Sequence, residues 1–462
     1  MPSFSRRRFL SACSAGAASA ALAPLLAQRA RAEQGIPAFG RGFGPLEPKL
    51  PINGAALPED LRGTPLLALP ENFEYMAVSI AGQTMSDGHC VPAAHDGMAS
   101  FRGPRGTAVL VRNHELSTSS NPVIVSGGAP YDTLRAGGTT TLVLGADGDL
   151  MSDYGSIAGT ERNCAGGPTP WGTWLTCEET FSATAGKRHG YVFEVPAGGV
   201  VAEPRPLTGM GRFNHEAAAV DPATSSVYLT EDRGDSLFYR YVPEVYSDLA
   251  RGGSLWALRL EDWPGGIDTK TGFKNLLNVP FAVDWVRIDE PDPASDTVRS
   301  EGQSKNAAVF SRGEGAWYGN GFVYFVCSNG GEAGRGQVWA YDPAAETLTL
   351  VFEAVAASEL GYADPSWNDE SVASNGGYVH AAPDNITVGP DGRLYLCEDG
   401  SGVEKVVGIN RAGELFEVMR NELNGSEFCG ACFSPDGRLM FVNIQSPGIT
   451  CVVRGNWREG RR

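Results

Sequence analysis

Short apolar runs of alternating β-branched and aromatic residues recur along the chain, each joined to the next by a tight turn. Turns with Asp-Gly, Asp-Pro or Ala-Gly chemistry connect such runs at residues 144–150, 220–229, 341–348 and 409–415. The two closest copies, residues 389–396 and 434–441, share Pro-Asp-Gly-Arg-Leu and start 45 residues apart. A propeller blade of four strands takes about 40–45 residues, so this spacing predicts a β-propeller.

The rest of the pattern also favours an all-β fold. A hydrophobic period of about 3.6 residues, typical of helices, is almost absent, and 59 glycines with 30 prolines favour short strands joined by tight turns. An array of β-sandwiches is the alternative, but it would need linker-like breaks between residues 60 and 455. We expect one catalytic domain over residues 61–462 with six blades, preceded by an irregular arm over residues 33–60.

The N-terminus has the pattern of an export signal. Ser5-Arg6-Arg7-Arg8-Phe9-Leu10 is a twin-arginine motif, an apolar stretch runs from Ala15 to Leu26, and Ala30-Arg31-Ala32 is a candidate cleavage site. A membrane anchor is the alternative, but the stretch is too short and too rich in small residues to span a bilayer. We expect the twin-arginine export machinery to deliver a periplasmic or secreted protein without residues 1–32 and without a membrane anchor.

The chain is acidic. Its formal charge of −17 becomes −22 when residues 1–32 are removed, because they contain five arginines and no acidic residue. This charge argues against nucleic acid as a partner. It also repels a phosphorylated substrate unless bound cations reverse the field locally, which carboxylates that hold calcium would achieve.

Eight of the nine cysteines lie outside the export signal. An even number in an exported chain indicates disulfides, and because these cysteines are sparse and irregularly spaced, we expect one or two bridges. Cys429-Gly-Ala-Cys432 has the spacing of a redox or zinc half-site. A structural role is favoured for it, since no second cysteine pair with ligand spacing accompanies it.

Residues 160–179 carry the strongest chemical signal. Cys164 lies in a glycine-rich bend, and the apolar run after it ends in Glu178 and Glu179. A thiolate and several carboxylates repel one another unless a cation lies between them, so the segment predicts a metal site. The thiolate favours a softer metal such as iron or zinc, whereas carboxylates favour calcium.

The tripeptide Asn-His-Glu occurs twice, at residues 113–115 and 214–216, in a chain with six histidines. A local hydrogen bond at the end of a strand explains either copy alone. Both copies adjoin apolar runs, at residues 108–111 and 217–220, and this recurrence predicts a shared role for Glu115 and Glu216.

Further polar groups adjoin apolar runs at Glu231-Asp232, Arg312-Gly313-Glu314, Asn329, Asp384-Asn385 and Glu398-Asp399. Carboxylates dominate this set and suit calcium, although a solvated turn explains Glu231 and Asp399 equally well. Arg312 can form an ordinary ion pair at the end of a strand. In a site full of cations, its planar fork would instead hold the non-bridging oxygens of a phosphate.

Several of these segments resemble the PhoX-type alkaline phosphatase family. The resemblance spans roughly residues 70–450 and rests on residues 163–167, 169–173, 175–179, 113–115, 212–213, 215–216, 433–445 and 447–448. The cysteine motif at residues 163–179 is specific enough to make chance a poor explanation. The resemblance implies a six-bladed propeller, exported by the twin-arginine route, that hydrolyses phosphate monoesters at an iron and calcium cluster.

The resemblance also implies roles for single residues. The implied metal ligands are Glu115, Cys164, Glu216, Glu314 and Asp384, with Cys164 as the thiolate ligand of iron. Arg312 is the implied catalytic, phosphate-binding arginine. Bound metals would polarise the phosphoryl oxygens and supply the nucleophile, so no serine nucleophile is needed. We expect calcium and iron as cofactors, a small phosphorylated substrate and a monomer.

Two other readings predict different behaviour. A calcium-dependent propeller lactonase or esterase would use carboxylates and Asn385 but not Cys164, so Cys164→Ser would leave it active. A non-catalytic binding propeller stabilised by metal would hold calcium without turnover.

Overall fold

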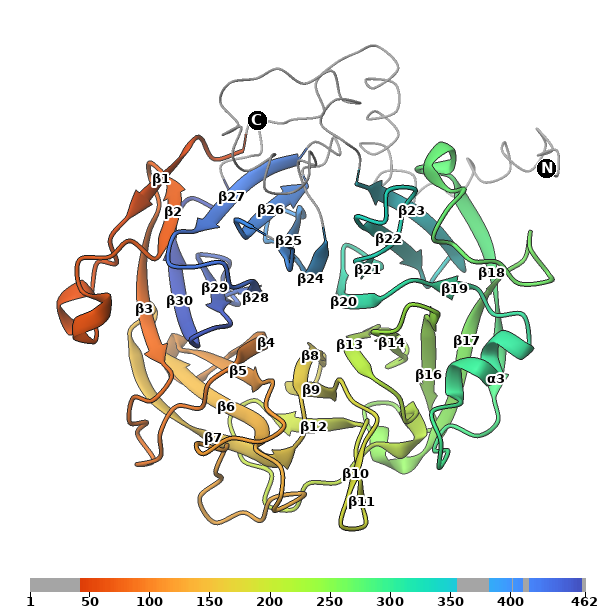
Figure 1. The fold of residues 1–462 in the computed structure, drawn as a ribbon, viewed down its shortest axis with the longest axis horizontal. Coiled ribbons are helices and arrows are strands. Elements are labelled where there is room, and N and C mark those ends of the chain that lie inside the picture. The colour runs from red at the N-terminus through yellow and green to blue at the C-terminus, as the bar shows by residue number, and fades with distance from the viewer. Residues whose placement is uncertain (1–41, 355–381, 401, 410–414, 459–462) are drawn as a thin grey trace.

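The strands form a ring of sheets around a central axis in the computed structural model, which describes residues 42–354, 382–400, 402–409 and 415–458 (Figure 1). Six strands line the axis, each beside the next and the last beside the first. In chain order they are β4 (His95–Arg102), β8 (Asn163–Pro168), β13 (His215–Val220), β20 (Gly313–Gly319), β24 (Pro383–Val388) and β28 (Phe428–Phe433). Six inner strands are the arrangement expected for six blades.

Each inner strand starts an antiparallel sheet that extends outward from the axis. The second strands are β5 (Ala108–His114), β9 (Thr173–Glu178), β14 (Val227–Glu231), β21 (Phe322–Cys327), β25 (Leu394–Glu398) and β29 (Leu439–Ile444). Farther out lie β6 (Gly137–Leu144), β7 (Leu150–Thr160), β12 (Val192–Pro196), β16 (Tyr239–Pro243), β17 (Gly253–Leu260), β22 (Gln337–Asp342), β23 (Thr347–Glu353), β26 (Lys405–Ile409), β27 (Leu415–Asn421) and β30 (Ile449–Arg454).

Strands from the start of the chain complete the blades at its end. β3 (Glu74–Ile80) pairs with β30, and β2 (Leu67–Pro70) joins β27 to β1 (Leu46–Lys49). β18 (Pro280–Ile288) pairs with both β17 and β23 and so joins two neighbouring blades. This pairing of the two ends closes the ring.

The remaining elements are short. They are the strands β10 (Ala183–Thr184), β11 (Lys187–Arg188), β15 (Ser236–Leu237) and β19 (Val309–Phe310), the helix α3 (Val298–Ser304), and single 3-10 turns at Gly54–Ala56, Glu59–Leu61, Pro104–Gly106, Thr208–Met210, Leu249–Arg251 and Lys274–Leu276. Within the described residues, no helix is long and apolar enough to cross a membrane.

All six inner strands carry a β-bulge at the same place near their first residues. The pairing with the second strand shifts between His95 and Met98, and equivalent shifts occur in β8, β13, β20, β24 and β28. A bulge re-aims the side chains of the extra residues. In four blades the residue just before the strand also has a left-handed backbone; these are Ala94, Arg162, Arg312 and Ala382, with φ of 49°, 49°, 53° and 49°. Such conformations are uncommon for residues other than glycine and cluster at functional sites.

The inner strands approach one another closely behind the bulges. A Cβ atom on Gly97 would lie 2.7 Å from Cα of Ala165, and one on Gly315 would lie 2.6 Å from the carbonyl oxygen of Asp384. Glycine is therefore required there so that neighbouring strands can meet. Farther along β20, the side chain of Trp317 packs against three hydrophobic clusters, each of which lies between neighbouring blades.

The structure confirms the all-β propeller. The Pro-Asp-Gly-Arg-Leu copies form the β24–β25 and β28–β29 turns of consecutive blades. The predicted export signal and the first part of the predicted arm lie outside the described residues, and the rest of the arm holds β1 and two 3-10 turns. The expectation of disulfides is wrong for the described residues, because all eight of their cysteines are free thiols.

Candidate metal centre

Five of the six inner strands have a potential metal ligand at their second residue. These residues are Asp96 in β4, Cys164 in β8, Glu216 in β13, Glu314 in β20 and Asp384 in β24. Each lies in the bulge, without a paired residue on the second strand. All five are more than nine-tenths buried. The repeated bulge therefore brings one acid or thiol from each of five blades to the same end of the axis.

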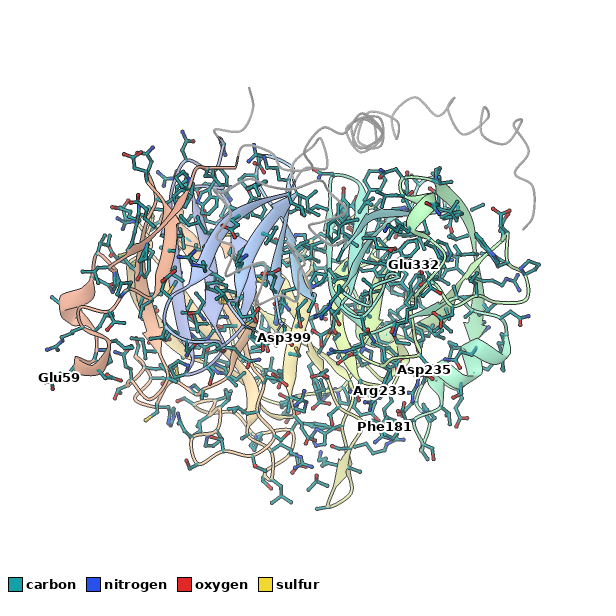
Figure 2. All side chains as sticks on the ribbon, turned by 45° about the horizontal axis from the view of Figure 1, so that its top comes forward. Glu59, Phe181, Arg233, Asp235, Glu332 and Asp399 are labelled. Atoms are coloured by element: carbon teal, nitrogen blue, oxygen red, sulfur yellow. The ribbon has the colours of Figure 1, made fainter. Side chains whose placement is uncertain are left out.

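A second set of side chains comes from the residue that follows the second strand of a blade. Four of these are acids: Glu115, Glu179, Asp232 and Asp399. Their backbone N–H groups donate to the carbonyl of the residue just before the inner strand, at 3.0 Å to Ala94, 2.8 Å to Arg162, 3.3 Å to Asn214 and 3.0 Å to Ala382, respectively. This hydrogen bond repeats from blade to blade and places each acid beside the first set. Asp399 accordingly lies near the middle of the ring, whereas Glu59 lies at its outer edge (Figure 2).

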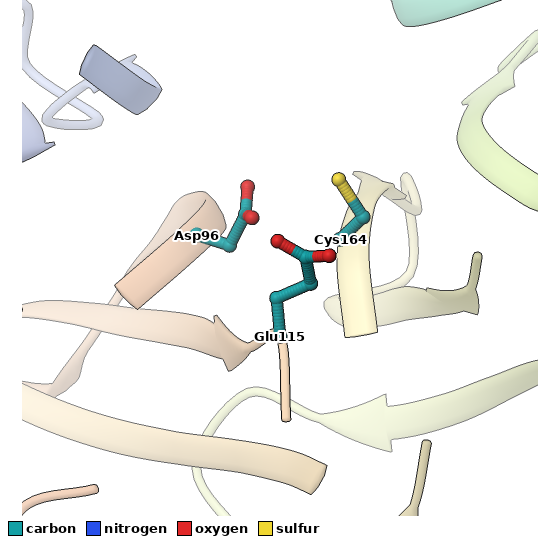
Figure 3. A group of neighbouring side chains, drawn as sticks. All are labelled: Asp96, Glu115 and Cys164. Carbon is teal, nitrogen blue, oxygen red and sulfur yellow. The ribbon is translucent and has the colours of Figure 1, made fainter. Parts of the chain in front are cut away.

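Apart from Asp232, the residues of the two sets, together with Glu427, form four overlapping groups in which one ligand atom of each residue lies within 4.8 Å of the others. Figure 3 shows one group, with the carboxyl groups of Asp96 and Glu115 directed toward the sulfur of Cys164. The other groups are Cys164, Glu179 and Glu216; Glu216, Glu314 and Asp384; and Asp384, Asp399 and Glu427. Because neighbouring groups share a residue, eight carboxyl groups and one thiol form a continuous cluster, which we call the acidic cluster.

The blade that begins with β28 departs from this pattern. Gly430 stands in its bulge with φ of 64°, and its N–H donates to Oδ1 of Asn385 at 2.6 Å. The acid comes instead from Glu427, just before the strand, and Gln445 after β29 donates to Oε2 of Glu115 at 3.0 Å. This blade thus contributes an acid and an amide from the loops at its edge.

Burial and mutual repulsion dominate the electrostatics of the acidic cluster. Burial raises the pKa of Asp96, Glu216 and Glu314 well above the usual range, and the charges of neighbouring carboxylates raise it further. Burial and the neighbouring acids likewise raise the pKa of the Cys164 thiol, whose Sγ donates to Oε1 of Glu216 at 3.2 Å. Burial raises the pKa of Asp384 to about 7. Groups of this kind become fully ionised only when cations share the site.

Among the residues that the structure describes, two arginines contact the acidic cluster. Arg312 donates from Nε and Nη2 to the two carboxylate oxygens of Asp232, at 2.7 and 2.9 Å, and its Nη2 lies 3.1 Å from Glu314. Arg162 lies with Nη2 2.6 Å from Glu115 and also bonds Glu179. Two guanidinium groups leave most of the eight carboxyl groups unneutralised, so the acidic cluster fits several cations.

All five predicted metal ligands lie in the acidic cluster, and predicted Arg312 contacts it. The sequence analysis paired Glu178 with Glu179, but only Glu179 belongs to the cluster. Glu178 points to His189, whose Nδ1 lies 2.7 Å away. For Asp399 and Glu231 the sequence fitted a metal ligand and a solvated turn equally well. Asp399 belongs to the cluster, whereas Glu231 accepts hydrogen bonds from Tyr239 and Arg299.

The two Asn-His-Glu copies reach the acidic cluster in different ways. Glu216 is the second residue of inner strand β13, whereas Glu115 follows second strand β5. Their histidines face away from it: the ring of His114 bonds the carbonyl of Ala93 and the hydroxyl of Thr140, and that of His215 bonds the carbonyl of Gly211. Both glutamates contribute to the cluster, but the tripeptides are not structural equivalents.

Sequence reasoning did not identify Asp96 or Glu427. Asp96 is followed by a glycine, as Glu314 is, and both precede an apolar run. This pattern of acid, small residue and apolar run at the start of an inner strand is the signal that could have found it. Glu427 has no such signal, because its blade departs from the repeat.

The donor set fits hard cations together with one softer metal. Carboxylate oxygens suit calcium, and a single thiolate suits iron or zinc. The oxygen donors outnumber the sulfur eight to one, and Cys164 shares groups with Asp96, Glu115, Glu179 and Glu216. One thiolate-bound metal next to several oxygen-bound cations is the occupancy that this arrangement supports.

Comparison with known proteins gives one family and one fold. The family model for alkaline phosphatase PhoX matches residues 52–153 and 145–448. Pseudomonas fluorescens PhoX, solved in complex with vanadate, a transition state analogue, has 17% sequence identity and a TM-score of 0.65, over 92% of this chain and 99% of that one.

Other matches are more distant. A gluconolactonase, XC5397 from Xanthomonas campestris, has 12% identity and a TM-score of 0.42, over 90% of this chain and 96% of that one. The comparison with curated protein sequences gave no match. The family match covers most of the chain and confirms the predicted class of enzyme, a phosphoric monoester hydrolase. The protein therefore belongs to the alkaline phosphatase PhoX family.

Proposed function

We propose that this phosphatase hydrolyses phosphate monoesters at a mixed iron and calcium centre held by the acidic cluster. Cys164 would hold iron, and Glu115, Glu216, Glu314 and Asp384 would hold the metals around it, joined by the other carboxylates of the cluster. The observation that carries the proposal is the convergence of eight carboxyl groups and one thiol from all six blades on one end of the axis. Bound cations would supply Lewis-acid polarisation of the phosphoryl oxygens and would lower the pKa of water.

The protein's own contribution begins with charge. A chain with a formal charge of −17 repels a phosphate ester over most of its surface. Arg312, with its side chain 43% exposed, is placed at the acidic cluster where an ester can reach it. Its bonds to Asp232 use Nε and Nη2, so Nη1 is the nitrogen left for a phosphoryl oxygen. A guanidinium held in this way stabilises the charge that develops on those oxygens.

The positions of the acids are fixed by hydrogen bonds rather than by cations alone. Ser328 donates to Oε1 of Glu314 at 2.6 Å, Asn385 donates to Oδ1 of Asp384 at 2.6 Å, and Gln445 donates to Glu115. These neutral donors hold the carboxylates without adding charge. They would orient the ligands for the metals and limit reorganisation during the reaction.

Hydrolysis of p-nitrophenyl phosphate and of a simple lactone by the same preparation tests the proposal. We expect the wild-type protein to cleave the phosphate ester, and Cys164→Ser to lose about 100-fold or more of that activity, the upper range for damage to a metal site. If the wild-type protein cleaves the lactone but not the phosphate ester, and Cys164→Ser still cleaves the lactone, the protein is a lactonase and this proposal is wrong. Binding of calcium without either reaction would indicate a non-catalytic propeller.

We further propose export through the twin-arginine pathway to the periplasm or beyond. The support is the motif at residues 5–10 and the candidate cleavage site at residues 30–32. Replacement of Arg6 and Arg7 by lysine keeps the charge but removes the twin arginines. We expect the precursor to stay in the cytoplasmic fraction. Equal amounts of mature protein outside the cytoplasm would contradict this route.

A further inference from the structure

Arg162 and Arg312 occupy the same position in two different blades. Each is the residue just before an inner strand, β8 or β20, and each has a left-handed backbone, with φ of 49° and 53°. Each carbonyl accepts the repeated hydrogen bond, from Glu179 N–H at 2.8 Å and from Ser328 N–H at 3.0 Å. The equivalent residues in the other four blades are Ala94, Asn214, Ala382 and Glu427, so among the described blades only these two have a basic side chain at this position.

The two guanidinium groups also share one contact, an acid of the preceding blade. Arg162 contacts Glu115, and Arg312 contacts Asp232; both acids follow the second strand of the preceding blade. Arg162 uses Nε for the carbonyl of Glu179 and Nη2 for its two carboxylates, and Arg312 likewise uses Nε and Nη2. The side chains are 41% and 43% exposed. Both forks thus hold acids through one edge and leave Nη1 outside these contacts.

We propose that Arg162 is a second phosphate-binding residue, which holds an oxygen of the substrate phosphoryl group opposite Arg312. β13 lies between β8 and β20, the strands that follow the two arginines. Glu216 on β13 belongs to the group with Cys164 and Glu179 and to the group with Glu314 and Asp384. A phosphoryl group above Glu216 would therefore have a guanidinium on two sides. Planar forks on two sides fix both the position and the orientation of a phosphate.

The arrangement of charges supports this role over a purely structural one. Arg162 bridges Glu115 and Glu179, and both belong to the groups around Cys164. Cations bound there would compete with the guanidinium for these carboxylates, as they would compete with Arg312 for Glu314. A partly exposed guanidinium that loses carboxylate partners gains donors for another anion. The inference rests on the proposed phosphatase function.

The test uses metal-loaded full-length protein with Arg162→Gln, Arg162→Lys and Arg312→Gln, and measures the affinity for inorganic phosphate by calorimetry together with iron and calcium content. We expect unchanged metal content and phosphate affinity about 10- to 100-fold weaker in both glutamine variants, the range for charge-assisted hydrogen bonds. Arg162→Lys should recover part of the loss. KM for p-nitrophenyl phosphate should rise in parallel.

Arg233→Gln is the matched control. Arg233 is a half-exposed arginine that donates to Asn214 at 2.9 Å and lies 3.9 Å from Asp296, so it has the charge of Arg162 near the same face without the equivalent position. Its phosphate affinity should stay within about twofold of the wild type, a difference well under 1.4 kcal/mol.

Three outcomes would overturn the inference. If Arg162→Gln binds phosphate as tightly as the wild type, Arg162 is not a phosphate-binding residue. If Arg312→Gln nevertheless binds phosphate more weakly, the proposed function still stands. Loss of metal in Arg162→Gln in proportion to the loss of affinity would make its role structural. A wild-type protein that binds no phosphate and cleaves no phosphate ester would contradict both the inference and the proposed function.

Discussion

Glu178 and Glu179 are neighbours in sequence, both are largely buried, and they have opposite surroundings. Glu178 accepts hydrogen bonds from the N–H groups of Glu161, Gly190 and Tyr191, at 2.8, 2.8 and 3.1 Å, and lies 2.7 Å from Nδ1 of His189. Glu179 shares Arg162 with Glu115 and otherwise lies among the other members of the acidic cluster, in a group with Cys164 and Glu216. Burial raises the pKa of Glu179 to about 7, with Arg162 opposing the shift and Glu115 adding to it.

The difference shows what separates a structural buried acid from a metal ligand. For Glu178 the protein supplies every donor itself, so its burial needs no ion. For Glu179 and its neighbours the protein supplies mostly other acceptors, and the missing positive charge has to come from outside the chain. Burial of an acid is therefore not the signal for a metal site. The signal is a buried acid whose neighbours are acids.

Removal of metal should affect the acidic cluster most. Prolonged chelation should abolish hydrolysis of p-nitrophenyl phosphate and lower the free energy of unfolding by about 3–4 kcal/mol, the effect of a ligand at 100 to 1,000 times its Kd. Kinetic assays and denaturant unfolding before and after chelation, with calcium and iron restored as a control, measure both. An unchanged unfolding curve would mean that the buried acids need no cation.

Glu178→Ala should have the next largest effect, and it should change the stability of the protein rather than its metal content. The substitution leaves three backbone N–H groups without their acceptor and His189 with Asp132 as its remaining carboxylate partner. Loss of one partner from a buried charged pair costs about 3–5 kcal/mol. Denaturant unfolding should show this loss, while metal content per folded protein stays that of the wild type. Loss of metal without loss of stability would assign Glu178 to the metal centre.

Glu216→Gln should change the two forms of the protein in opposite directions. In the metal-free protein it removes a buried carboxyl group whose pKa is held above its ordinary value by burial and by neighbouring acids. Such a group costs stability at neutral pH, so the free energy of unfolding should rise by about 1 kcal/mol, near the value of one pKa unit. In the metal-loaded protein it removes a ligand, so metal affinity should fall. Unfolding curves of both forms give the two signs, and a loss of stability in the metal-free form would contradict the assignment.

The smallest effect should be a pH dependence at His189. Burial lowers the pKa of this imidazole, but its hydrogen bond to Glu178, the charge of Glu178 and the hydrogen bond to Asp132 outweigh burial, so its pKa is raised. A group whose pKa is raised in the folded state stabilises the protein most below its ordinary pKa and loses that effect as pH rises through the raised value.

His189→Gln gives the measurement. The difference in unfolding free energy between the wild-type protein and His189→Gln should therefore be larger at pH 6 than at pH 9, and smaller at both than the effect of Glu178→Ala. A difference that grows with pH would mean that His189 is neutral in the folded protein.

Much of the fold could be predicted because its signals are local. The turns at residues 389–392 and 434–437 fix hairpins through Asp-Gly chemistry, and their spacing gives the length of a blade. Pairing of β3 with β30 could not be predicted in this way, since it joins residues more than 360 positions apart through backbone hydrogen bonds that carry no side-chain signature.

The residues of the candidate site also differ in whether a local sequence signal marks them. Cys164 and Glu314 stand next to glycines or small residues at the start of apolar runs, so sequence alone marks them. The opposite directions of Glu178 and Glu179 depend on where β9 ends and on contacts with Gly190, which sequence does not show. Free cysteines in place of disulfides have a similar cause, because seven of the eight described thiols are fixed by the strands that carry them and not by spacing along the chain.

Elemental analysis of natively exported protein tests the central claim most directly, because it asks whether the buried acids and the thiol hold metal. Cys164→Ala removes the thiol of the acidic cluster. Its control is Cys177→Ala, because Cys177 is a fully buried residue of β9 that packs in a hydrophobic cluster. We expect iron and calcium in the wild-type protein and in Cys177→Ala, and calcium without iron in Cys164→Ala. Wild-type protein that contains neither metal, or iron that is unaffected by Cys164→Ala, would contradict the account.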